Sequence, residues 1–343
     1  MAGDEAKVNI TVPLVSVIMP AYNAEATLKA SAESVLGQSM RELELIIIDD
    51  GSKDATPSVG KAIAESDPRA RFVSQPNSGP AAARNRGFDL AHGKYITLAD
   101  SDDYLDPDML KVMLEAAEST GADTAVCGAS IEYPNGGGAD RDVRFGAEGL
   151  FSGEKLKDLF DLEGMTIFFS GWGKLYKRSI VEEYGLRMDN SYRITEDSDF
   201  AMRYLENCRS VYLVDRCFYR YMQVNGASLT SVKDPEALKT AAFNIASRLR
   251  SLMLKWGMER AEAQRRADEY LYGQLNSAAF IKLRSGAGRA EKKAFYNDVI
   301  SADGIKSYLR NGKLSSRMLA LGFAPAMAYT RLHSAYLKVR GKQ

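Results

Sequence analysis

Short apolar runs and amphipathic segments alternate along the first third of this 343-residue chain. The apolar runs lie at residues 14–19, 43–49, 70–74, 94–99 and 122–128. Helical patterns lie between them at 27–38, 55–65, 79–91 and 106–120. Strands that alternate with helices form parallel βαβ units with right-handed crossovers. The sequence therefore predicts an α/β fold with a doubly wound, mainly parallel, Rossmann-like sheet that binds ligands beyond the carboxyl ends of its strands.

The remainder of the chain is less regular. A glycine-rich stretch at 133–142 has no apolar period and predicts a hairpin tip or a mobile loop. Residues 196–208 have a helical pattern, 210–215 have the composition of a strand, and 234–283 are helical. We therefore expect an N-terminal extension, an α/β domain and a helical C-terminal region, at 1–12, 13–218 and 219–343.

Composition excludes several classes of protein. The 45 basic and 45 acidic residues balance, so no overall charge attracts nucleic acid. The three cysteines are odd in number and widely separated, which is typical of reduced thiols rather than of disulfides. The acidic N-terminus lacks the apolar core of a secretory signal. The apolar stretch from Met318 to Tyr329 is shorter than the roughly 20 residues of a membrane-spanning helix, and Pro325 interrupts it. We expect a cytoplasmic protein without a transmembrane helix.

Polar segments follow the apolar runs where four predicted strands end. Their sequences are MPAYN, IIDDGSKD, QPNSGPAAARNRG and LADSDD, at 19–23, 47–54, 75–87 and 98–103. Tyr22 offers a flat face for a base, Asp50 an acceptor for an imide or ribose donor, and Arg84 a fork for phosphate. Asp100 and Asp102 offer oxygen ligands for a divalent cation, which would also relieve the repulsion between the carboxylates. Together the segments predict a site for a nucleotide diphosphate and a metal.

The same segments resemble a known family. VSVIMPAYN, IIIDDGS, NSGPAAARNRG and YITLADSDD, in this order and at these separations, are similar to the nucleotide-sugar-binding half of family 2 glycosyltransferases, which have the GT-A fold. The resemblance covers residues 14–215 and includes two segments similar to the family's acceptor side, GWGKLYKRSI and TEDSDF. It implies a nucleotide-sugar half at 13–128 and an acceptor half at 129–218. Each motif alone is weak, but four in register are specific.

The resemblance implies nucleotide-binding roles for matching residues. Pro20 and Tyr22 would line the nucleobase site, and Asp50 would contact the uracil or the ribose. Arg84 and Asn85 would lie near the nucleotide. The donor implied is a nucleotide-sugar, with a UDP-sugar the first expectation.

The resemblance also implies a metal and a base. Asp100, Ser101 and Asp102 correspond to the family's Asp-x-Asp motif, with Asp102 a direct ligand of Mn²⁺ or Mg²⁺. Asp100 would meet the ribose or a metal-bound water, and Ser101 belongs to the same nucleotide site. Asp197 matches the general base of inverting members. In a single displacement the base removes the proton of an acceptor hydroxyl while the cation stabilises the leaving diphosphate, so no covalent nucleophile is required.

Some of these residues have purely structural alternatives. Glu196 and Asp197 are also the residues that the first turn of a helix favours after an N-cap Thr195. Asp50 precedes a glycine, which is ordinary turn chemistry. Arg84 also fits the surface of an alanine-rich helix.

The remaining candidates are less specific. Tyr22 could serve packing alone, and Trp172 and Lys174 suit contact with a sugar, although a core tryptophan fits the same sequence. Glu196 is a further candidate for the sugar or acceptor side. Segment 219–231 lacks the histidine with which family members often close on the diphosphate, so Arg220 or Gln223 would have to replace it.

The C-terminal tail has a distinct charge pattern. No acidic residue follows Asp303, and eight basic residues alternate there with apolar ones, namely Lys306, Arg310, Lys313, Arg317, Arg331, Lys338, Arg340 and Lys342. Each basic residue near an anionic bilayer contributes about 1 kcal/mol of binding free energy. The tail therefore predicts peripheral contact with the inner face of a membrane, and a solvated basic helix end is the alternative.

The sequence as a whole predicts a metal-dependent inverting glycosyltransferase. It would move one sugar from a UDP-sugar to a hydroxyl of a glycan or glycolipid in cell-surface polysaccharide synthesis, and a homo-oligomer is compatible with this. The alternative is a non-catalytic nucleotide-sugar-binding or scaffolding subunit. A sugar nucleotidyltransferase and a dinucleotide-binding oxidoreductase are disfavoured because PAYNAEATL, and no glycine-rich loop, follows the first predicted strand.

Overall fold

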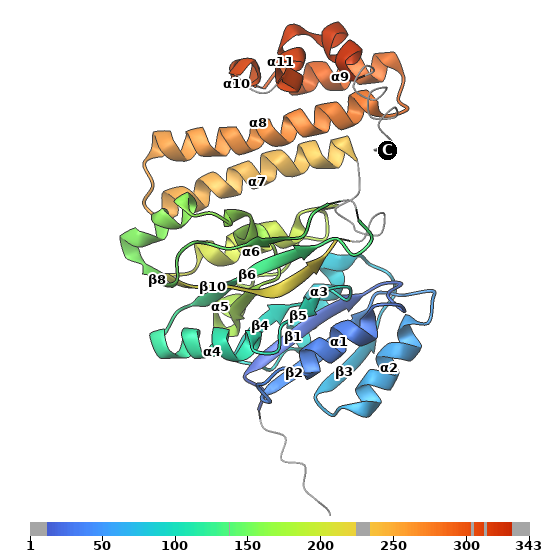
Figure 1. Cartoon of the computed structure of the whole chain (residues 1–343), viewed down its shortest axis with the longest axis vertical. Helices are drawn as coiled ribbons and strands as arrows, with labels where there is room; N and C mark the ends of the chain where they lie inside the picture. Colours follow the sequence, from blue (N-terminus) through green and yellow to red (C-terminus); the bar gives the residue numbers. More distant parts are fainter. Residues whose placement is uncertain (1–11, 137, 224–233, 303–304, 312–313, 331–343) are drawn as a thin grey trace, which may run out of the picture. The chain divides into compact units, whose positions relative to one another are not determined.

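The computed structural model describes residues 12–136, 138–223, 234–302, 305–311 and 314–330. The chain divides into two compact units (Figure 1). An α/β unit contains Met1–Ser191 and Glu196–Gly226. A helical unit contains Tyr192–Thr195 and Ala227–Gln343. The predicted combination of an α/β fold with a helical C-terminal region is confirmed.

A ten-stranded sheet forms the core of the α/β unit, in the order β3-β2-β1-β4-β9-β6-β10-β5, with β7 beside β6 and β8 beside β10. Its first four strands are parallel and are β1 (Val15–Ala21), β2 (Leu43–Asp49), β3 (Ala70–Ser74) and β4 (Tyr95–Leu98). Every residue of β2 is buried, as expected for a parallel strand covered on both faces. The chain runs outward from β1 to β3 and returns to β4 on the other side of β1, which is where doubly wound sheets bind ligands.

The second half of the sheet is mixed. The strands are β5 (Tyr104–Leu105), β6 (Thr124–Glu132), β7 (Arg141–Val143), β8 (Gly149–Ser152), β9 (Lys174–Lys177) and β10 (Ser210–Met222). β9 is antiparallel to both β4 and β6, whereas β10 is parallel to β6. β6 and β7 form a hairpin around the glycine-rich stretch, as predicted. β10 continues to Met222, so the sheet extends four residues beyond the expected boundary at 218.

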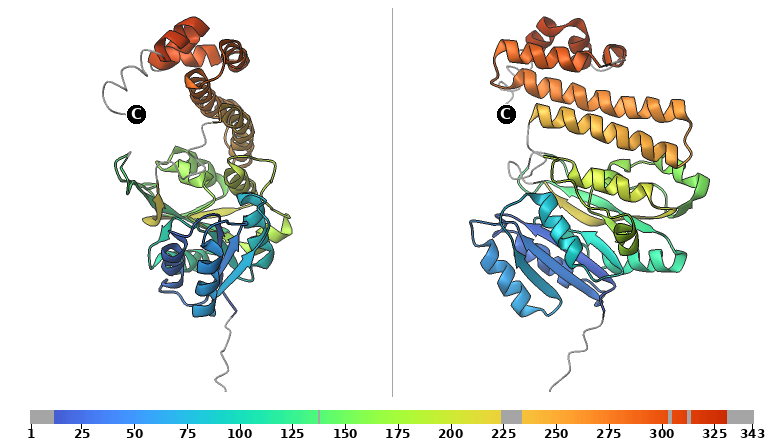
Figure 2. Two further views of the ribbon diagram at one scale, coloured as in Figure 1. Left: turned by 90° about the vertical axis from the view of Figure 1, so that its right-hand side faces the viewer. Right: turned by 180° about the vertical axis from the view of Figure 1, so that it is seen from behind.

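Helices cover both faces of this sheet (Figure 2). They are α1 (Leu28–Leu36), α2 (Thr56–Ser66), α3 (Pro80–Leu90), α4 (Met109–Thr120), α5 (Arg178–Glu183) and α6 (Glu196–Glu206), with 3₁₀ segments η1 (Gly153–Asp161) and η2 (Met165–Phe169). α3 approaches β1 closely at Gly87, where an added Cβ would lie 2.2 Å from Cγ2 of Ile18. The last glycine of the NSGPAAARNRG segment is therefore required for packing.

The helical unit consists of α7 (Pro235–Lys255), α8 (Arg260–Arg284), α9 (Arg289–Ile300), α10 (Ile305–Asn311) and α11 (Leu314–Leu321). Asp234 caps α7 by accepting hydrogen bonds from the backbone N–H groups of Glu236 and Ala237, at 3.0 and 3.2 Å. Among the described residues, no helix is both long and apolar enough to cross a membrane. Five of the eight basic residues of the tail, including Arg331 and Lys338, lie outside the described residues.

Candidate active site

The loops after β1 and β2 are joined by hydrogen bonds. Asn23, in the left-handed region at φ 50°, accepts a bond from the backbone N–H of Lys53 at 2.9 Å and donates its own N–H to Ser52 Oγ at 2.9 Å. This rigid platform carries Tyr22, whose side chain is 48% exposed. Tyr22 is thus open to a ligand and does not pack in the core. Pro20 is half-buried in β1.

Asp50 organises the loop that precedes α3. Its carboxylate accepts hydrogen bonds from Gln75 Nε2 (2.8 Å) and from the backbone N–H groups of Ser78 (2.9 Å) and Gly79 (2.8 Å). The side chain is buried. Turn chemistry is instead supplied by Asp49, which accepts from the backbone N–H of Ser52 at 3.1 Å. Any contact of Asp50 with uracil or ribose would share a carboxylate that already accepts three bonds.

Arg84 connects two acidic segments that are far apart in sequence. Its Nη2 lies 2.8 Å from Oδ1 of Asp100, and its Nη1 lies 3.0 Å from Oε1 of Glu196. The guanidinium is buried, yet these carboxylates and Asp197 raise its pKa. Both arms of the guanidinium are engaged by carboxylates, so Arg84 is not an open fork here, and its role beside the nucleotide stays a prediction. Part of the positive charge that the acidic cluster requires comes from the chain itself.

Asn85 has a different partner from the one predicted. Its amide donates to the backbone carbonyl of Met188 at 2.8 Å and accepts from the N–H of Met188 at 2.8 Å. Both hydrogen-bonding groups of the side chain are thereby occupied. Asn85 ties α3 to the segment before α6, and its place near the nucleotide stays a prediction.

The loop after β4 is held by residues of two distant elements, α1 and β10. Ser31 Oγ donates to the backbone carbonyl of Ser101 at 2.9 Å. Tyr219 accepts from the N–H of Asp100 at 3.2 Å and donates its hydroxyl to Asp103 at 2.7 Å. Asp103 also accepts from the N–H of Met222 at 2.8 Å. This buried aspartate was missed in the sequence, although it is the fourth residue of the DSDD segment and only its position there could have suggested a role.

Asp102 is the acid in this loop best suited to bind a cation. Burial, and then the neighbouring Asp100, raise the pKa of Asp102 to about 6. Within the described part of the chain it forms no ion pair, whereas Asp100 is paired with Arg84. The described residues contain no cluster of three potential metal-ligating side chains. Two carboxylates fit a hard divalent ion whose remaining ligands are phosphate oxygens and water.

Asp197 lies at the start of α6 and faces the loop before β9. It accepts hydrogen bonds from the backbone N–H of Gly171 at 3.0 Å and of Ser198 at 2.8 Å. Thr195 does not cap the helix, since its backbone has φ 67° and its buried hydroxyl has no hydrogen-bond partner. A left-handed β-branched residue is strained, and such strain occurs most often at functional sites. Burial raises the pKa of the adjacent Glu196 despite Arg84.

Lys174 does not reach a sugar as expected. It is fully buried, and its ammonium donates to the backbone carbonyls of Ile167, Ser170 (2.7 Å) and Trp172 (3.3 Å). The loop that it gathers includes Gly171, which binds Asp197. Lys174 is corrected to a residue that shapes this loop from inside the protein.

The charge on Lys174 gives a testable pH dependence. Burial lowers the pKa of this lysine to about 7, whereas it is about 10.5 in an unfolded chain. Between pH 7 and pH 10 the unfolded chain still binds the Lys174 proton that the folded protein has lost. The free energy of unfolding of wild type therefore rises with pH over this range. The variant Lys174→Met lacks this term. We expect the free energy of unfolding of wild type, minus that of the variant, to increase by up to about 1.4 kcal/mol per pH unit.

Urea denaturation at pH 6, 7, 8 and 9 measures this difference. Lys177→Met is the matched control, because Lys177 is partly exposed and paired with Asp123. A wild-type-minus-variant difference that stays constant over the series would contradict the expectation.

Trp172 and Arg220 also have protein partners. The indole stacks on Tyr219 with a centroid distance of 4.5 Å and an interplanar angle of 8°, and on Tyr221 at 5.4 Å. Trp172 is half-buried: it packs against these rings, as a core tryptophan does, and it keeps some exposed surface that a sugar could contact. Arg220 makes a bidentate ion pair with Glu132 at 2.7 and 3.0 Å, so it is not a free replacement for the missing histidine.

The site thus unites the polar ends of β1, β2 and β4, the start of α3 and the start of α6. The model of a known family, glycosyl transferase family 2, matches residues 16–185. The chain belongs to this family. The matched residues contain all four strand-end segments, which confirms the resemblance found in the sequence.

Relatives of this family 2 member have names that refer to a glycosyltransferase or to succinoglycan biosynthesis. EpsH of Bacillus subtilis (strain 168) is 34% identical over 212 residues, which are 61% of this chain and 60% of that protein. The succinoglycan biosynthesis protein ExoO of Rhizobium meliloti (strain 1021) is 36% identical over 198 residues, or 54% of each chain. The chain therefore spans less than two thirds of the length of these curated relatives.

A solved structure has the same fold. Residues 1–349 of TarS from S. aureus, in complex with UDP-GlcNAc, align with a TM-score of 0.65 and 19% identity. The alignment covers 94% of this chain and 91% of that one. The GT-A-type fold predicted from the sequence is confirmed by this similarity.

Proposed function

We propose that this protein transfers a single sugar from a UDP-sugar to a hydroxyl of a glycan or glycolipid, with inversion at the anomeric carbon. The observation that carries the proposal is that Arg84 makes two ion pairs. They join Asp100, in the candidate metal loop, to Glu196, which directly precedes the candidate base Asp197. The leaving-group side and the acceptor side of one reaction are thereby held together.

The residues have separate tasks in this proposal. Tyr22 presents its exposed ring to the base of the nucleotide, and Asp50 keeps the loop before α3 in place beneath it. Asp197 accepts the proton of the acceptor hydroxyl, in a position set by the N–H of Gly171. Asp102, with Asp100, would hold Mn²⁺ or Mg²⁺, which when bound supplies positive charge for the leaving diphosphate.

The relatives support the choice of substrates. TarS binds UDP-GlcNAc, which favours a UDP-sugar as the donor here. ExoO is named for succinoglycan biosynthesis, which favours a growing surface polysaccharide as the acceptor. A lipid-linked acceptor at the inner face of a membrane is supported by the sequence of the basic tail, of whose eight basic residues five lie outside the described residues.

Ligand-dependent thermal stability tests the donor half of this proposal. The purified protein is heated with UDP, GDP, dTDP or CDP, each with and without Mn²⁺. A ligand at 100 times its dissociation constant adds about 2.7 kcal/mol, which moves the midpoint by roughly 5–10 °C. We expect a shift that needs both UDP and Mn²⁺. No shift with any nucleotide would contradict the proposal. Binding of UDP-sugars without release of UDP in the presence of any acceptor would favour the non-catalytic subunit.

A further inference from the structure

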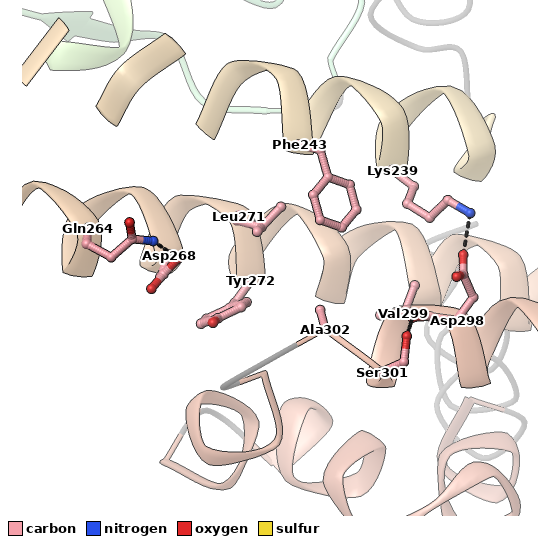
Figure 3. A pocket seen from close by; sticks show the side chains of 10 residues that line it. All are labelled: Lys239, Phe243, Gln264, Asp268, Leu271, Tyr272, Asp298, Val299, Ser301 and Ala302. Atoms are coloured by element: carbon pink, nitrogen blue, oxygen red, sulfur yellow. Dashed lines mark hydrogen bonds and ion pairs between the residues drawn. The ribbon is translucent and has the colours of Figure 1, made fainter. Parts of the chain in front are cut away.

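The helical unit contains a pocket of its own, which none of the predicted site residues lines. Its volume is about 350 Å³, and side chains of α7, α8 and α9 form its walls (Figure 3). Ligand sites for small molecules begin at about this size. The family match ends at residue 185, before this unit begins to form its three long helices. The pocket therefore lies outside the residues that the family model matches.

An exposed aromatic ring stands in this pocket. Phe243 projects from α7 toward α8 (Figure 3), and 46% of its surface is exposed. Other rings of this unit have aromatic neighbours, such as Phe280 with Tyr329 and Tyr296 with Phe323. Within the described residues Phe243 has no ring partner. Its free face is the kind of surface on which the C–H groups of a pyranose pack.

Polar groups of the pocket are held in fixed positions. Lys239 Nζ lies 2.5 Å from Oδ2 of Asp298 and 3.0 Å from Glu236. Gln264 Nε2 donates to Oδ1 of Asp268 at 2.9 Å. Each aspartate keeps a second carboxylate oxygen and further lone pairs for a ligand hydroxyl. Preorganised acceptors of this kind lose little entropy when they bind.

The charge of the lining excludes some ligands. One lysine and two aspartates face the pocket, so its lining is negative overall. This balance disfavours nucleotides and phosphates, which are anions. The paired charges also disfavour a lipid chain, because an apolar ligand would strip them of water without replacing their hydrogen bonds. A neutral ligand with many hydroxyl groups satisfies both conditions.

We propose that this pocket binds a neutral oligosaccharide segment of the glycan on which the α/β unit acts. The identity of the occupant rests on the proposed function, whereas the site rests on Phe243, Asp268 and Asp298. One pyranose packs against the Phe243 ring, and its hydroxyls donate to the two carboxylates. The helical unit thereby retains a glycan chain that is longer than the sugar undergoing reaction.

Saturation-transfer NMR on the full chain tests this assignment. The probes are cellotetraose, chitotetraose and laminaritetraose, each at millimolar concentration. We expect at least one probe to bind wild type and to bind the variant Phe243→Ala about tenfold more weakly, because the ring contact is lost. Leu321→Ala is the control, since Leu321 is 71% exposed in the same unit but does not line the pocket. Gln264→Ala, which releases Asp268, is a second variant expected to weaken binding.

The outcomes separate this inference from the proposed function. Binding of no probe, or equal binding to Phe243→Ala and wild type, would overturn the pocket assignment. The stability shift with UDP and Mn²⁺ is measured on the same samples. If that shift persists while no probe binds, only the pocket assignment fails. If probes bind through Phe243 but UDP gives no shift, the pocket stands as a glycan site and the transferase proposal fails.

Discussion

Replacing Asp197 with asparagine is expected to abolish sugar transfer while leaving the affinity for UDP nearly unchanged. The change replaces the carboxylate, which can take up the proton of the acceptor hydroxyl, with an amide, which cannot. General base catalysis contributes about 10²–10⁴-fold in rate. The amide oxygen can still accept one of the two backbone N–H bonds, from Gly171 or Ser198. We therefore expect a loss of kcat of at least about 100-fold with little change in the thermal midpoint.

Asp199→Asn provides the contrast. This residue lies in the same first turn of α6, but it is buried and paired with Arg203 at 2.7 Å. Its replacement removes the charged partner of the half-buried Arg203, which among the described residues keeps only its bond to the carbonyl of Arg187, so the thermal midpoint should fall while kcat persists. Release of UDP from a UDP-sugar in the presence of an acceptor measures kcat, and calorimetry with UDP measures affinity. Equal loss of UDP binding and transfer in Asp197→Asn would mean that the residue supports structure and is no base.

Replacing Asp102 with asparagine is expected to remove the Mn²⁺-dependent part of nucleotide binding and to make the ligand-free protein more stable. The first effect follows because a neutral amide is a much weaker ligand for a hard cation. The second follows from the pKa of Asp102, which is about 6 in the folded protein against an ordinary 3.8. A raised pKa means that the ionised carboxylate is disfavoured by folding, so at pH 7 its removal should stabilise by on the order of 1–3 kcal/mol.

The pH dependence has a definite sign. Without metal, the folded protein binds the proton on Asp102 more tightly than the unfolded chain, so this group adds stability as pH falls from about 6 toward 3.8. Mn²⁺ competes with that proton, and its affinity should weaken below pH 6. Asp103→Asn is the matched control. Both carboxylate oxygens of Asp103 already accept hydrogen bonds, from Tyr219 and from the N–H of Met222, so the Mn²⁺ requirement should persist in this variant. A Mn²⁺ requirement that persists in Asp102→Asn would exclude this residue as a metal ligand.

Sequence periodicity was sufficient for the parallel part of the fold. β1 to β4 are short apolar runs followed by helices, and their burial depends on local pattern and on the handedness of the crossovers. The same reasoning located the strand ends and thus the segments that contain Tyr22, Asp50 and Asp102. It did not predict that β9 would insert antiparallel between β4 and β6, because a four-residue strand carries little periodic signal.

The partners of the charged residues were decided by tertiary structure alone. Arg84 meets Glu196 across 112 positions of sequence, and Asp103 meets Tyr219 across 116. Lys174 has the sequence context of a loop residue, yet the folded chain buries its ammonium among backbone carbonyls. Side-chain pairing of this kind depends on where separate strands end in space, and no local pattern records it. The sequence by itself determined the family, the sheet and the edge where chemistry would occur; the tertiary structure decided which of the described carboxylates are paired within the protein and which are not.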